Sequence, residues 1–442
     1  MKWHKVKVGD FLIRVKDLVP IIDNEEYNLV TIKLYHRGVQ LRKKVRGSEI
    51  QAEKMSKVKA GQFILSGIDA RNGAFGIIPK ELDGAVVTND FWHFEIDRNI
   101  MSNEYFLWLS STPYFDDICN KASDGTTNRI RLQSNRFYAQ ELMIPEIQDQ
   151  HKVVEELKST NNKLKSLESE YQFQLTQIEN LNQAILQEAA QGKIVPQDPN
   201  DESAKELLKR IKAEKIKAGI KEKPLPPIKA EEIPFEIPES WVWCRIDEIT
   251  SKIGSGSTPK GSNYSKTGYP FFRSQNIYNE GLIYEDIKFI SNDTQRQMKG
   301  TIVYPNDILL NITGGSMGRC ALVPENLIEG NVSQHVCIIR PIELNVNFFH
   351  KLVLSPYFQK FIFSSTSGAG REGLPKYNLE KFVIPIPPLN EQVRIIKEIE
   401  KQLEKTKQLK AHIVTNQKAT EQLLKALLHE AFEVEEEIQI QN

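Results

Sequence analysis

The chain has 442 residues, of which 40% are hydrophobic and 26% are charged, with 58 basic and 58 acidic side chains. This length predicts about three domains with ample buried core, and the composition is that of an ordinary globular protein. The formal net charge of zero neither supports nor excludes nucleic-acid binding, because any basic surface would have to be local.

The first ten residues, MKWHKVKVGD, contain no apolar signal core, and no apolar run approaches the length of a membrane span. We therefore expect a cytoplasmic protein without a membrane-spanning segment. The four cysteines form no Cys-x-x-Cys pair, which suits a reducing compartment and argues against structural zinc. His335 and His350 are interpreted as core residues, since no further Cys or His stands at zinc-ligand spacing.

In chain order, the first predicted domain is a compact mixed domain over residues 1–145. Short apolar alternations such as FLIRV, LVTIKLYH, QFILSGI, FGIIP and FWHFEI predict strands broken by Gly, Asn and Asp turns. The segment NEYFLWLSSTPYF predicts a short amphipathic helix that ends near Pro113. A polar loop with three arginines follows, and ELMIPEI predicts a last strand.

A long polar segment from Ile147 to Lys193 predicts a single helix. Its apolar residues recur at alternating steps of three and four, and no Pro or Gly interrupts it before Gly192. About 45 residues of helix span about 65–70 Å, and so narrow an apolar stripe requires a second helix as partner. The segment from Leu389 to Phe432 supplies one, with a similar stripe.

The two long segments match each other at a constant offset. Pro145 pairs with Pro387, Gln150 pairs with Gln392, and AILQEAA from Ala184 pairs with ALLHEAF from Ala426. One offset held throughout indicates an internal repeat. We expect the helices to pair antiparallel within one chain, although the sequence also permits pairing between chains.

The connection after the first long helix predicts a short basic helix over residues 204–217 and an extended, semi-rigid Pro-rich linker over residues 224–238. The globular part beyond it repeats the first domain. The matched positions are Trp3 and Val6 with Trp243 and Ile246, Phe63–Leu65 with Ile308–Leu310, Ile78-Pro79 with Val323-Pro324, Pro113–Phe115 with Pro356–Phe358, and Arg129 and Leu132 with Arg371 and Leu374.

These observations predict an α+β fold: two homologous mixed α/β domains joined by two long antiparallel coiled-coil helices, with a pseudo-two-fold internal repeat. The expected boundaries are 1–145 for the first domain, 146–235 for a central region, 236–387 for the second domain and 388–442 for the C-terminal helix region. Two related heads with different loops on a rigid spacer suggest a device that reads two different things at a fixed distance.

The junction AILQEAAQGKIVPQDPNDESAKELLKRIKAEK, followed by IPFEIPESWVWCRIDEI, resembles the central region of type I restriction–modification specificity subunits. The pattern IPIPPLNEQ before a long helix resembles the exit of that family's target-recognition domains, whereas the first exit, MIPEIQDQ, departs from the usual Pro-Pro and Glu-Gln. The resemblance covers the full chain.

This resemblance implies two target-recognition domains that each read half of a split site in double-stranded DNA. It also implies two methyltransferase (modification) subunits docked on the conserved helices and two restriction subunits in the full complex. No cofactor is expected in this chain; S-adenosylmethionine would belong to the methyltransferase, and ATP and Mg²⁺ to the restriction subunit.

Basic and amide side chains mark the segments that we expect to contact DNA, because lysine neutralises phosphates while Arg, Asn and Gln can read base edges. In the first domain the candidates are Arg37, Arg42, Lys43, Lys44, Arg46, Arg71, Asn72, Arg129 and Arg131. In the second domain they are Thr258, Lys260, Arg273, Gln275, Asn276, Ser316, Arg319, Arg371 and Lys376.

Each of these segments also has a structural interpretation. The run YHRGVQLRKKVRGSEI suits a solvated edge strand protected by lysines. Arg129 and Arg371 could anchor their loops to acidic neighbours. The glycines and serines at 254–258 suit an ordinary turn, and the segment 273–276 suits a hydrogen-bonded loop without a DNA role.

Catalytic motifs are missing from the sequence. There is no Gly-x-x-x-x-Gly-Lys-Ser/Thr loop, and the nearest string to the Asn/Asp-Pro-Pro-Tyr/Phe segment of amino-methyltransferases is Ile386-Pro-Pro-Leu389. We therefore expect a non-catalytic subunit. A coiled-coil scaffold whose repeated heads bind proteins is the alternative hypothesis; a free-standing nuclease or methylase would need a motif that the chain lacks.

Overall fold

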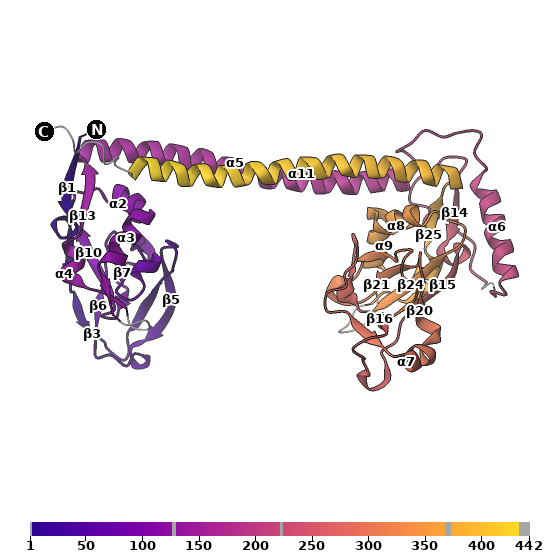
Figure 1. Ribbon diagram of the computed structural model, residues 1–442, viewed down its shortest axis with the longest axis horizontal. Helices are drawn as coiled ribbons and strands as arrows, with labels where there is room; N and C mark the ends of the chain where they lie inside the picture. The colour runs from indigo at the N-terminus through magenta and orange to yellow at the C-terminus, as the bar shows by residue number, and fades with distance from the viewer. Residues whose placement is uncertain (1, 126–129, 222–223, 367–372, 433–442) are drawn as a thin grey trace. The chain divides into compact units, whose positions relative to one another are not determined.

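The computed structural model describes residues 2–125, 130–221, 224–366 and 373–432. The chain divides into two compact units. Unit 1 is Met1–Tyr171 with Val414–Asn442, and unit 2 is Gln172–Ile413. Each unit contains one globular head and one section of each long helix, α5 (Ile147–Ala190) and α11 (Leu389–Phe432) (Figure 1). Both long helices have the bounds that the sequence predicts to within three residues.

The head of unit 1 is built from short strands and helices. Its strands are β1 (Trp3–Lys7), β2 (Leu12–Val15), β3 (Leu18–Pro20), β4 (Glu26–Ile32), β5 (Val39–Arg46), β6 (Lys54–Lys57), β7 (Phe63–Ser66), β8 (Phe75–Ile77), β9 (Val86–Val87), β10 (Phe91–Ile96), β11 (Ser123–Asp124), β12 (Arg131–Leu132) and β13 (Glu141–Pro145). Its helices are α1 (Val8–Phe11), α2 (Asn103–Ser110), α3 (Pro113–Lys121) and α4 (Ser134–Tyr138).

The head of unit 2 follows the same plan. Its strands are β14 (Val242–Arg245), β15 (Thr250–Ser255), β16 (Tyr269–Phe272), β17 (Ile277–Tyr278), β18 (Gly281–Leu282), β19 (Lys288–Ile290), β20 (Ile302–Val303), β21 (Ile308–Asn311), β22 (Cys320–Leu322), β23 (Gly330–Val332), β24 (Val336–Pro341) and β25 (Val383–Ile386). Its helices are α6 (Ala204–Lys217), α7 (Asn292–Gln297), α8 (Val346–Leu354), α9 (Pro356–Ser364) and α10 (Lys376–Lys381).

The sheets confirm the internal repeat, because each unit contains the same strand orders. The sheet β2-β10-β7-β8 of unit 1 corresponds to β15-β24-β21-β22 of unit 2. A second sheet, β3-β6-β9-β4-β5 in unit 1, corresponds to β20-β23-β16-β19 in unit 2 with one extra edge strand, β3. The small pair β1-β13 corresponds to β14-β25.

Strands β7 and β21 are buried on both faces, which explains their unbroken apolar sequences. Phe63 and Leu65 of β7 belong to one core cluster of unit 1, while Ile64 between them belongs to another. In β21 of unit 2, Ile308 and Leu310 belong to one core cluster, while Leu309 between them belongs to another. Alternate side chains of a strand point to opposite faces, so each head has two cores, one on either side of this strand.

One helix boundary differs from the sequence prediction. The segment NEYFLWLSSTPYF forms two helices rather than one, because Pro113 begins α3 instead of ending α2. Proline suits the first position of a helix, where its missing N–H would have no partner. The equivalent Pro356 begins α9 in unit 2, so the predicted match between these two prolines is confirmed.

A second difference concerns the match of the first tryptophans. Trp3 lies opposite Pro145 in the β1-β13 pair, whereas in β14-β25 Trp243 lies opposite Pro385 and Val242 opposite Ile386. Pro145 corresponds to Pro387, so the equivalent of Trp3 is Trp241. The predicted match with Trp243 is wrong by two residues, because an apolar pattern alone permits such a slip.

The long helices pair antiparallel, as predicted. In unit 1, Val153 and Leu157 of α5 share a core with Leu428 and Phe432 of α11, and Tyr171 hydrogen-bonds Thr420 at 3.2 Å. In unit 2, Asn182 accepts a hydrogen bond from Thr406 at 2.7 Å, and Ile185 shares a core with Ile396 and Ile399. Residues later in α5 therefore contact residues earlier in α11, as antiparallel pairing requires.

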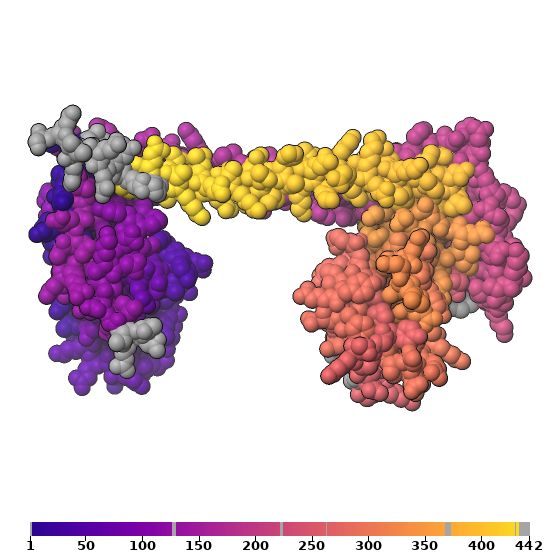
Figure 2. Space-filling view, in the orientation of Figure 1, coloured from indigo at the N-terminus to yellow at the C-terminus, as the bar shows by residue number. Residues whose placement is uncertain are grey.

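Several apolar side chains of the predicted stripes remain exposed along these helices. Leu167 and Leu423 are 43% and 51% exposed in unit 1, and Leu181 is 47% exposed in unit 2. A two-helix seam buries only a narrow strip of each helix, so flanking apolar positions stay in contact with solvent. Figure 2 shows side chains of α11 at the surface along the helix, in yellow.

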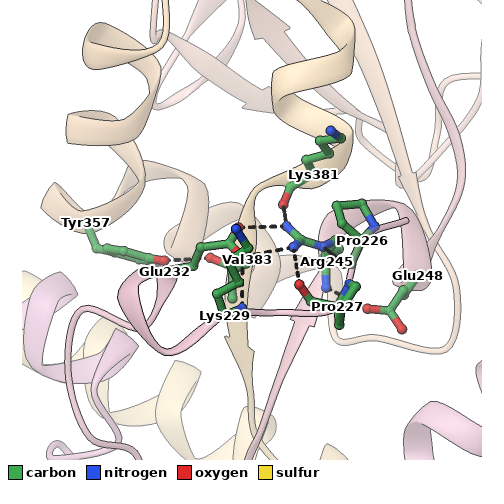
Figure 3. A network of polar contacts seen from close by, with 9 residues as sticks. All are labelled: Pro226, Pro227, Lys229, Glu232, Arg245, Glu248, Tyr357, Lys381 and Val383. Atoms are coloured by element: carbon green, nitrogen blue, oxygen red, sulfur yellow. Dashed lines mark hydrogen bonds and ion pairs between the residues drawn. The ribbon is translucent and has the colours of Figure 1, made fainter. Parts of the chain in front are cut away.

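The Pro-rich segment Pro224–Pro238, here called the strap, is attached to the head of unit 2 through Arg245 (Figure 3). The Arg245 guanidinium is almost fully buried and donates to the carbonyls of Pro226 at 2.9 Å and Pro227 at 3.2 Å, to both carboxylate oxygens of Glu232 at 3.1 Å, and to the carbonyl of Lys381. Phe235 packs on Trp243 and Tyr357 with ring centroids 5.1 Å apart in each pair.

Candidate nucleic-acid interface

In each head a four-residue turn carries the chain from the second sheet to the first. In unit 1 the turn Thr88–Phe91 joins β9 to β10, and Phe91 N–H donates to Thr88 O at 3.0 Å. In unit 2 the turn Ser333–Val336 joins β23 to β24, and Val336 N–H donates to Ser333 O at 3.0 Å. We call these segments the central turns.

The same backbone hydrogen bonds hold both central turns in place. Gly67 N–H donates to Asp90 O at 2.7 Å in unit 1, and Ile312 N–H donates to His335 O at 3.0 Å in unit 2. Leu132 N–H donates to Gly67 O and Leu374 N–H to Ile312 O, at 2.8 and 2.9 Å. Backbone geometry is therefore conserved between the heads while the side chains differ.

In unit 2 four further segments surround the central turn. Ser257 N–H donates to Val332 O, and Ser333 N–H donates to Phe272 O, at 3.2 and 2.9 Å. The Thr313 hydroxyl contacts His335 Nδ1 at 2.7 Å, and Thr313 forms a bridge with Gly373. The loops after β15, β16 and β21, and the segment leading to α10, thus meet at one place.

In unit 1 the loop after β7 connects the central turn to the tip of the β4-β5 hairpin. This loop contains a 3₁₀-helix, Ala70–Asn72. Tyr35 N–H donates to Asn72 O at 2.9 Å, and His36 N–H donates to Gly73 O at 3.0 Å. Gly73 adopts φ +71°, and a Cβ there would lie 2.6 Å from the His36 ring, so glycine is required at this close approach.

Strand β5 carries the basic run of unit 1 on an exposed sheet edge. Arg42, Lys43, Lys44 and Arg46 are exposed in β5, which is the last strand of its sheet, and Arg37 is exposed just before it. Pairing with β4 slips by one residue at Arg42, between Leu29 and Val30. The interpretation of this run as an edge strand is therefore correct for the protein backbone. The basic side chains remain accessible, so they could still contact the phosphates of DNA.

The other described candidates of unit 1 lie beside the central turn. Asn72 is exposed, and Arg71 next to it is half-buried with its Nε–H buried and unpaired. Arg131 donates to the Asp90 carboxylate at 2.9 Å, with both side chains about half exposed. This ion pair fixes the Arg131 loop against the central turn; the anchoring predicted for Arg129 and Arg371 concerns residues outside the described ranges.

In unit 2 the exposed candidates are Thr258, Lys260, Gln275 and Lys376. Lys376 lies 3.5 Å from Glu380 in its own helix. Ser316 accepts a hydrogen bond from buried Asn311 at 3.2 Å, and the Arg319 guanidinium lies 4.6 Å from the centre of the Tyr278 ring. Arg273 donates to Asp286 O at 2.9 Å.

Asn276 is buried and hydrogen-bonded within its own loop. Its side chain is fully buried; its amide donates to the carbonyls of Ile283 and Glu285 at 3.0 and 3.3 Å and accepts from Arg273 N–H. The hydrogen-bonded-loop interpretation describes this residue, and its contact with DNA stays a prediction. Arg129 and Arg371 lie outside the described residues.

Buried polar atoms without a hydrogen-bond partner gather in these loops. Among the described residues such atoms include Arg71 Nε in unit 1 and Arg273 Nε, Asn311 Oδ1 and Ser333 Oγ in unit 2. An unpaired buried polar group is costly, and sites of this kind commonly serve a ligand or ordered water. The loop clusters therefore have unused hydrogen-bonding capacity.

Burial controls the chemistry of the four cysteines. Cys119, Cys244, Cys320 and Cys337 are buried, and burial raises the pKa of each thiol, to about 12 for Cys337. At neutral pH these thiols stay protonated and unreactive. Within the described ranges no cluster of His, Cys, Asp or Glu is arranged to hold a metal ion. None of the described helices has the length and apolar character that crossing a bilayer requires.

Sequence reasoning missed the central turns. Asn89 and Gln334 are exposed there, and His335, which the sequence suggested was a core residue, is only partly buried. The signal that would have found them is the offset of 245 between Phe63 and Ile308, because it also aligns Asn89 with Gln334.

The family described as the type I restriction modification DNA specificity domain matches residues 1–177 and 238–415. The chain belongs to this family. It is 33% identical over 269 residues to the type I restriction enzyme EcoEI specificity subunit of Escherichia coli, covering 57% of this chain and 43% of that protein. The EcoAI specificity subunit of E. coli is 34% identical over 267 residues, covering 57% and 44%.

The matched region thus spans less than half of each of these relatives. Among solved structures, a type I R-M system described for its complex assembly and conformational transition has a TM-score of 0.63 and 16% identity, covering 97% of both chains. The HsdS subunit from Thermoanaerobacter tengcongensis has a TM-score of 0.54 and 17% identity, covering 97% of this chain and 96% of that one. These likenesses establish the fold.

Proposed function

We propose that this chain is the DNA-specificity subunit of a type I restriction–modification complex, in which each head reads one half of a bipartite target in double-stranded DNA. One observation carries the proposal: both heads hold the same hydrogen-bonded central turn and surround it with different exposed polar loops. A shared frame with divergent loops is what reading two different half-sites requires.

The two kinds of DNA contact would come from different parts of a head. Exposed lysines and arginines of β5, with Lys260 and Lys376 in unit 2, suit phosphate contacts that carry no sequence information. Arg71, Asn72 and Gln275 suit base edges, since Arg pairs with guanine and Asn or Gln with adenine in the major groove.

The long helices would serve as spacer and docking surface. Exposed Leu167 and Leu423 in unit 1 and Leu181 in unit 2 offer apolar contacts to a partner protein. We assign that surface to two methyltransferase subunits, with two restriction subunits completing a cytoplasmic complex. This chain would be non-catalytic, S-adenosylmethionine belonging to the methyltransferase and ATP with Mg²⁺ to the restriction subunit.

Binding measurements on the chain co-purified with its neighbouring methyltransferase test this proposal. We expect affinity for genomic duplex DNA that falls steeply with salt, and a tight fraction of fragments that resists a large excess of unrelated duplex. The methyltransferase alone is the control. Equal binding by the methyltransferase without this chain would contradict the proposal and favour a scaffold role.

A further inference from the structure

The central turns of the two heads carry a carboxamide at the same position. Asn89 and Gln334 each stand second in their four-residue turn, between Thr88 and Phe91 in unit 1 and between Ser333 and Val336 in unit 2. Both side chains are exposed. The other loops around the turns differ between the heads in length and chemistry. The carboxamide is a side-chain group that both heads share at an exposed position of the turn.

The residues on either side hold the turns and leave the carboxamides available. Asp90 is paired with Arg131 at 2.9 Å, and His335 contacts Thr313 at 2.7 Å. No hydrogen bond of the described structure engages the Asn89 or Gln334 side chain, whereas backbone hydrogen bonds from Gly67 and Ile312 fix the turn beneath each of them. A binding group on a rigid turn loses little entropy when it engages a ligand.

Position within the sheets adds to the argument. Each central turn joins an inner strand of one sheet to an inner strand of the other, so the loops that contain the exposed candidates flank it on several sides. Arg71 and Asn72 lie in a loop bonded to the turn of unit 1; Thr258 and Gln275 lie in loops bonded to the turn of unit 2. Each carboxamide therefore lies on a turn that is hydrogen-bonded to loops carrying exposed candidates of its own head.

We propose that Asn89 and Gln334 each read one adenine in the half-site of their own head. A carboxamide donates from its NH₂ group to adenine N7 and accepts at its oxygen from the adenine N6 amine, a bidentate pair that no other base offers in the major groove. The inference rests on the proposed function, because it assumes that each head contacts a half-site.

The experiment is a selection from a random duplex pool by the chain in complex with its methyltransferase, followed by sequencing of the bound fraction. For Gln334→Ala we expect loss of preference for one A·T pair in one half-site by about ten- to hundredfold, with the other half-site and the gap unchanged. Asn89→Ala should do the same in the other half-site only. Gln297→Ala, an exposed carboxamide on α7, should change nothing.

Gln334→Glu keeps the shape of the side chain but can only accept hydrogen bonds, so we expect the preference at that position to move toward cytosine. Intact motifs in both alanine variants, or a uniform loss of affinity across all sequences, would overturn this inference alone. A wild-type complex that selects no two-part motif would overturn the proposed function as well.

Discussion

At the scale of single residues, Arg245 determines the path of a whole segment. An arginine side chain has five N–H donors, and all five are used here by the strap, Glu232 and Lys381. The equivalent position in unit 1 is Lys7, because Lys7 N–H donates to Asp10 as Arg245 N–H donates to Glu248. Lys7 is exposed, whereas Arg245 is buried.

Replacing Arg245 with alanine would leave the Pro226 and Pro227 carbonyls and Glu232 without this partner. We expect the free energy of unfolding to fall by about 2–4 kcal/mol, since charged hydrogen bonds at a buried site are worth about 1.5–3 kcal/mol and the vacated space adds to the loss. Urea denaturation followed by tryptophan fluorescence measures it. Arg210→Ala, which removes an exposed ion-pair partner of Glu202 and Glu343, is the control and should change little.

The exposed lysines of β5 give a second prediction at this scale. Changing Lys43 and Lys44 together to serine should weaken DNA binding about equally for all sequences and reduce the slope of log affinity against log salt by about 2, because each phosphate contact contributes about 0.9. Titrations at several salt concentrations measure the slope. Lys209→Ser on α6 is the matched control, and an unchanged slope in the β5 variant would remove β5 from the interface.

At the scale of elements, attachment of the strap should depend on pH. Arg245, with the Lys229 backbone N–H, holds the pKa of Glu232 below its ordinary value of 4.5. The stabilisation is therefore present above pH 4.5 and is lost as the pH falls through the lowered pKa. Pepsin cleavage within residues 224–238 should accelerate as the pH falls below 4.5, relative to an unstructured peptide substrate.

The matched variant for that experiment is Glu232→Gln. Its neutral side chain keeps some hydrogen bonds to Arg245 but has no carboxylate to titrate, so its relative cleavage rate should be nearly independent of pH. Equal pH dependence in wild type and variant would show that Glu232 does not control the strap.

The long helices give a prediction about distance. Inserting four residues after Tyr171 in α5 and after Ile413 in α11 adds about 6 Å to both helices, which corresponds to about two base pairs of duplex. We expect the unread gap in the DNA target to lengthen while both half-sites stay the same. Sequencing of DNA methylated by the altered complex measures both; changed half-sites with the original gap would contradict the role of the helices as a spacer.

How well an element could be predicted depends on how its residues are constrained. The long helices could be predicted from the spacing of their apolar residues, and the end of the first one from Gly192. In the structure Gly192 has the left-handed φ of +72° that is common just after a helix. Local pattern could not decide that Pro113 begins a helix, or that the strap folds onto a head. The strap depends on Arg245, which lies 13–19 residues from its partners in the strap and also donates to Lys381, 136 residues away in sequence.

At the scale of the whole molecule, the two halves of the repeat place side-chain interactions at equivalent positions but make them with different residue types. Gln62 donates to Glu95 at 2.8 Å in unit 1, and at the equivalent positions Arg340 donates to Asp307 at 2.6 Å in unit 2. Such swaps weaken sequence matches although the backbone frame is the same. For this reason the sequence supports the family and the repeat but does not separate exposed candidates such as Gln275 from buried Asn276.

The measurement that tests the central claim most directly is a genome-wide methylation map of cells that make this chain with its neighbouring methyltransferase, beside a strain that lacks only this chain. The account predicts a two-part methylated motif with an unread gap of fixed length, present only when the chain is made. Methylation that is unchanged by the deletion would contradict the account and favour a protein-binding scaffold.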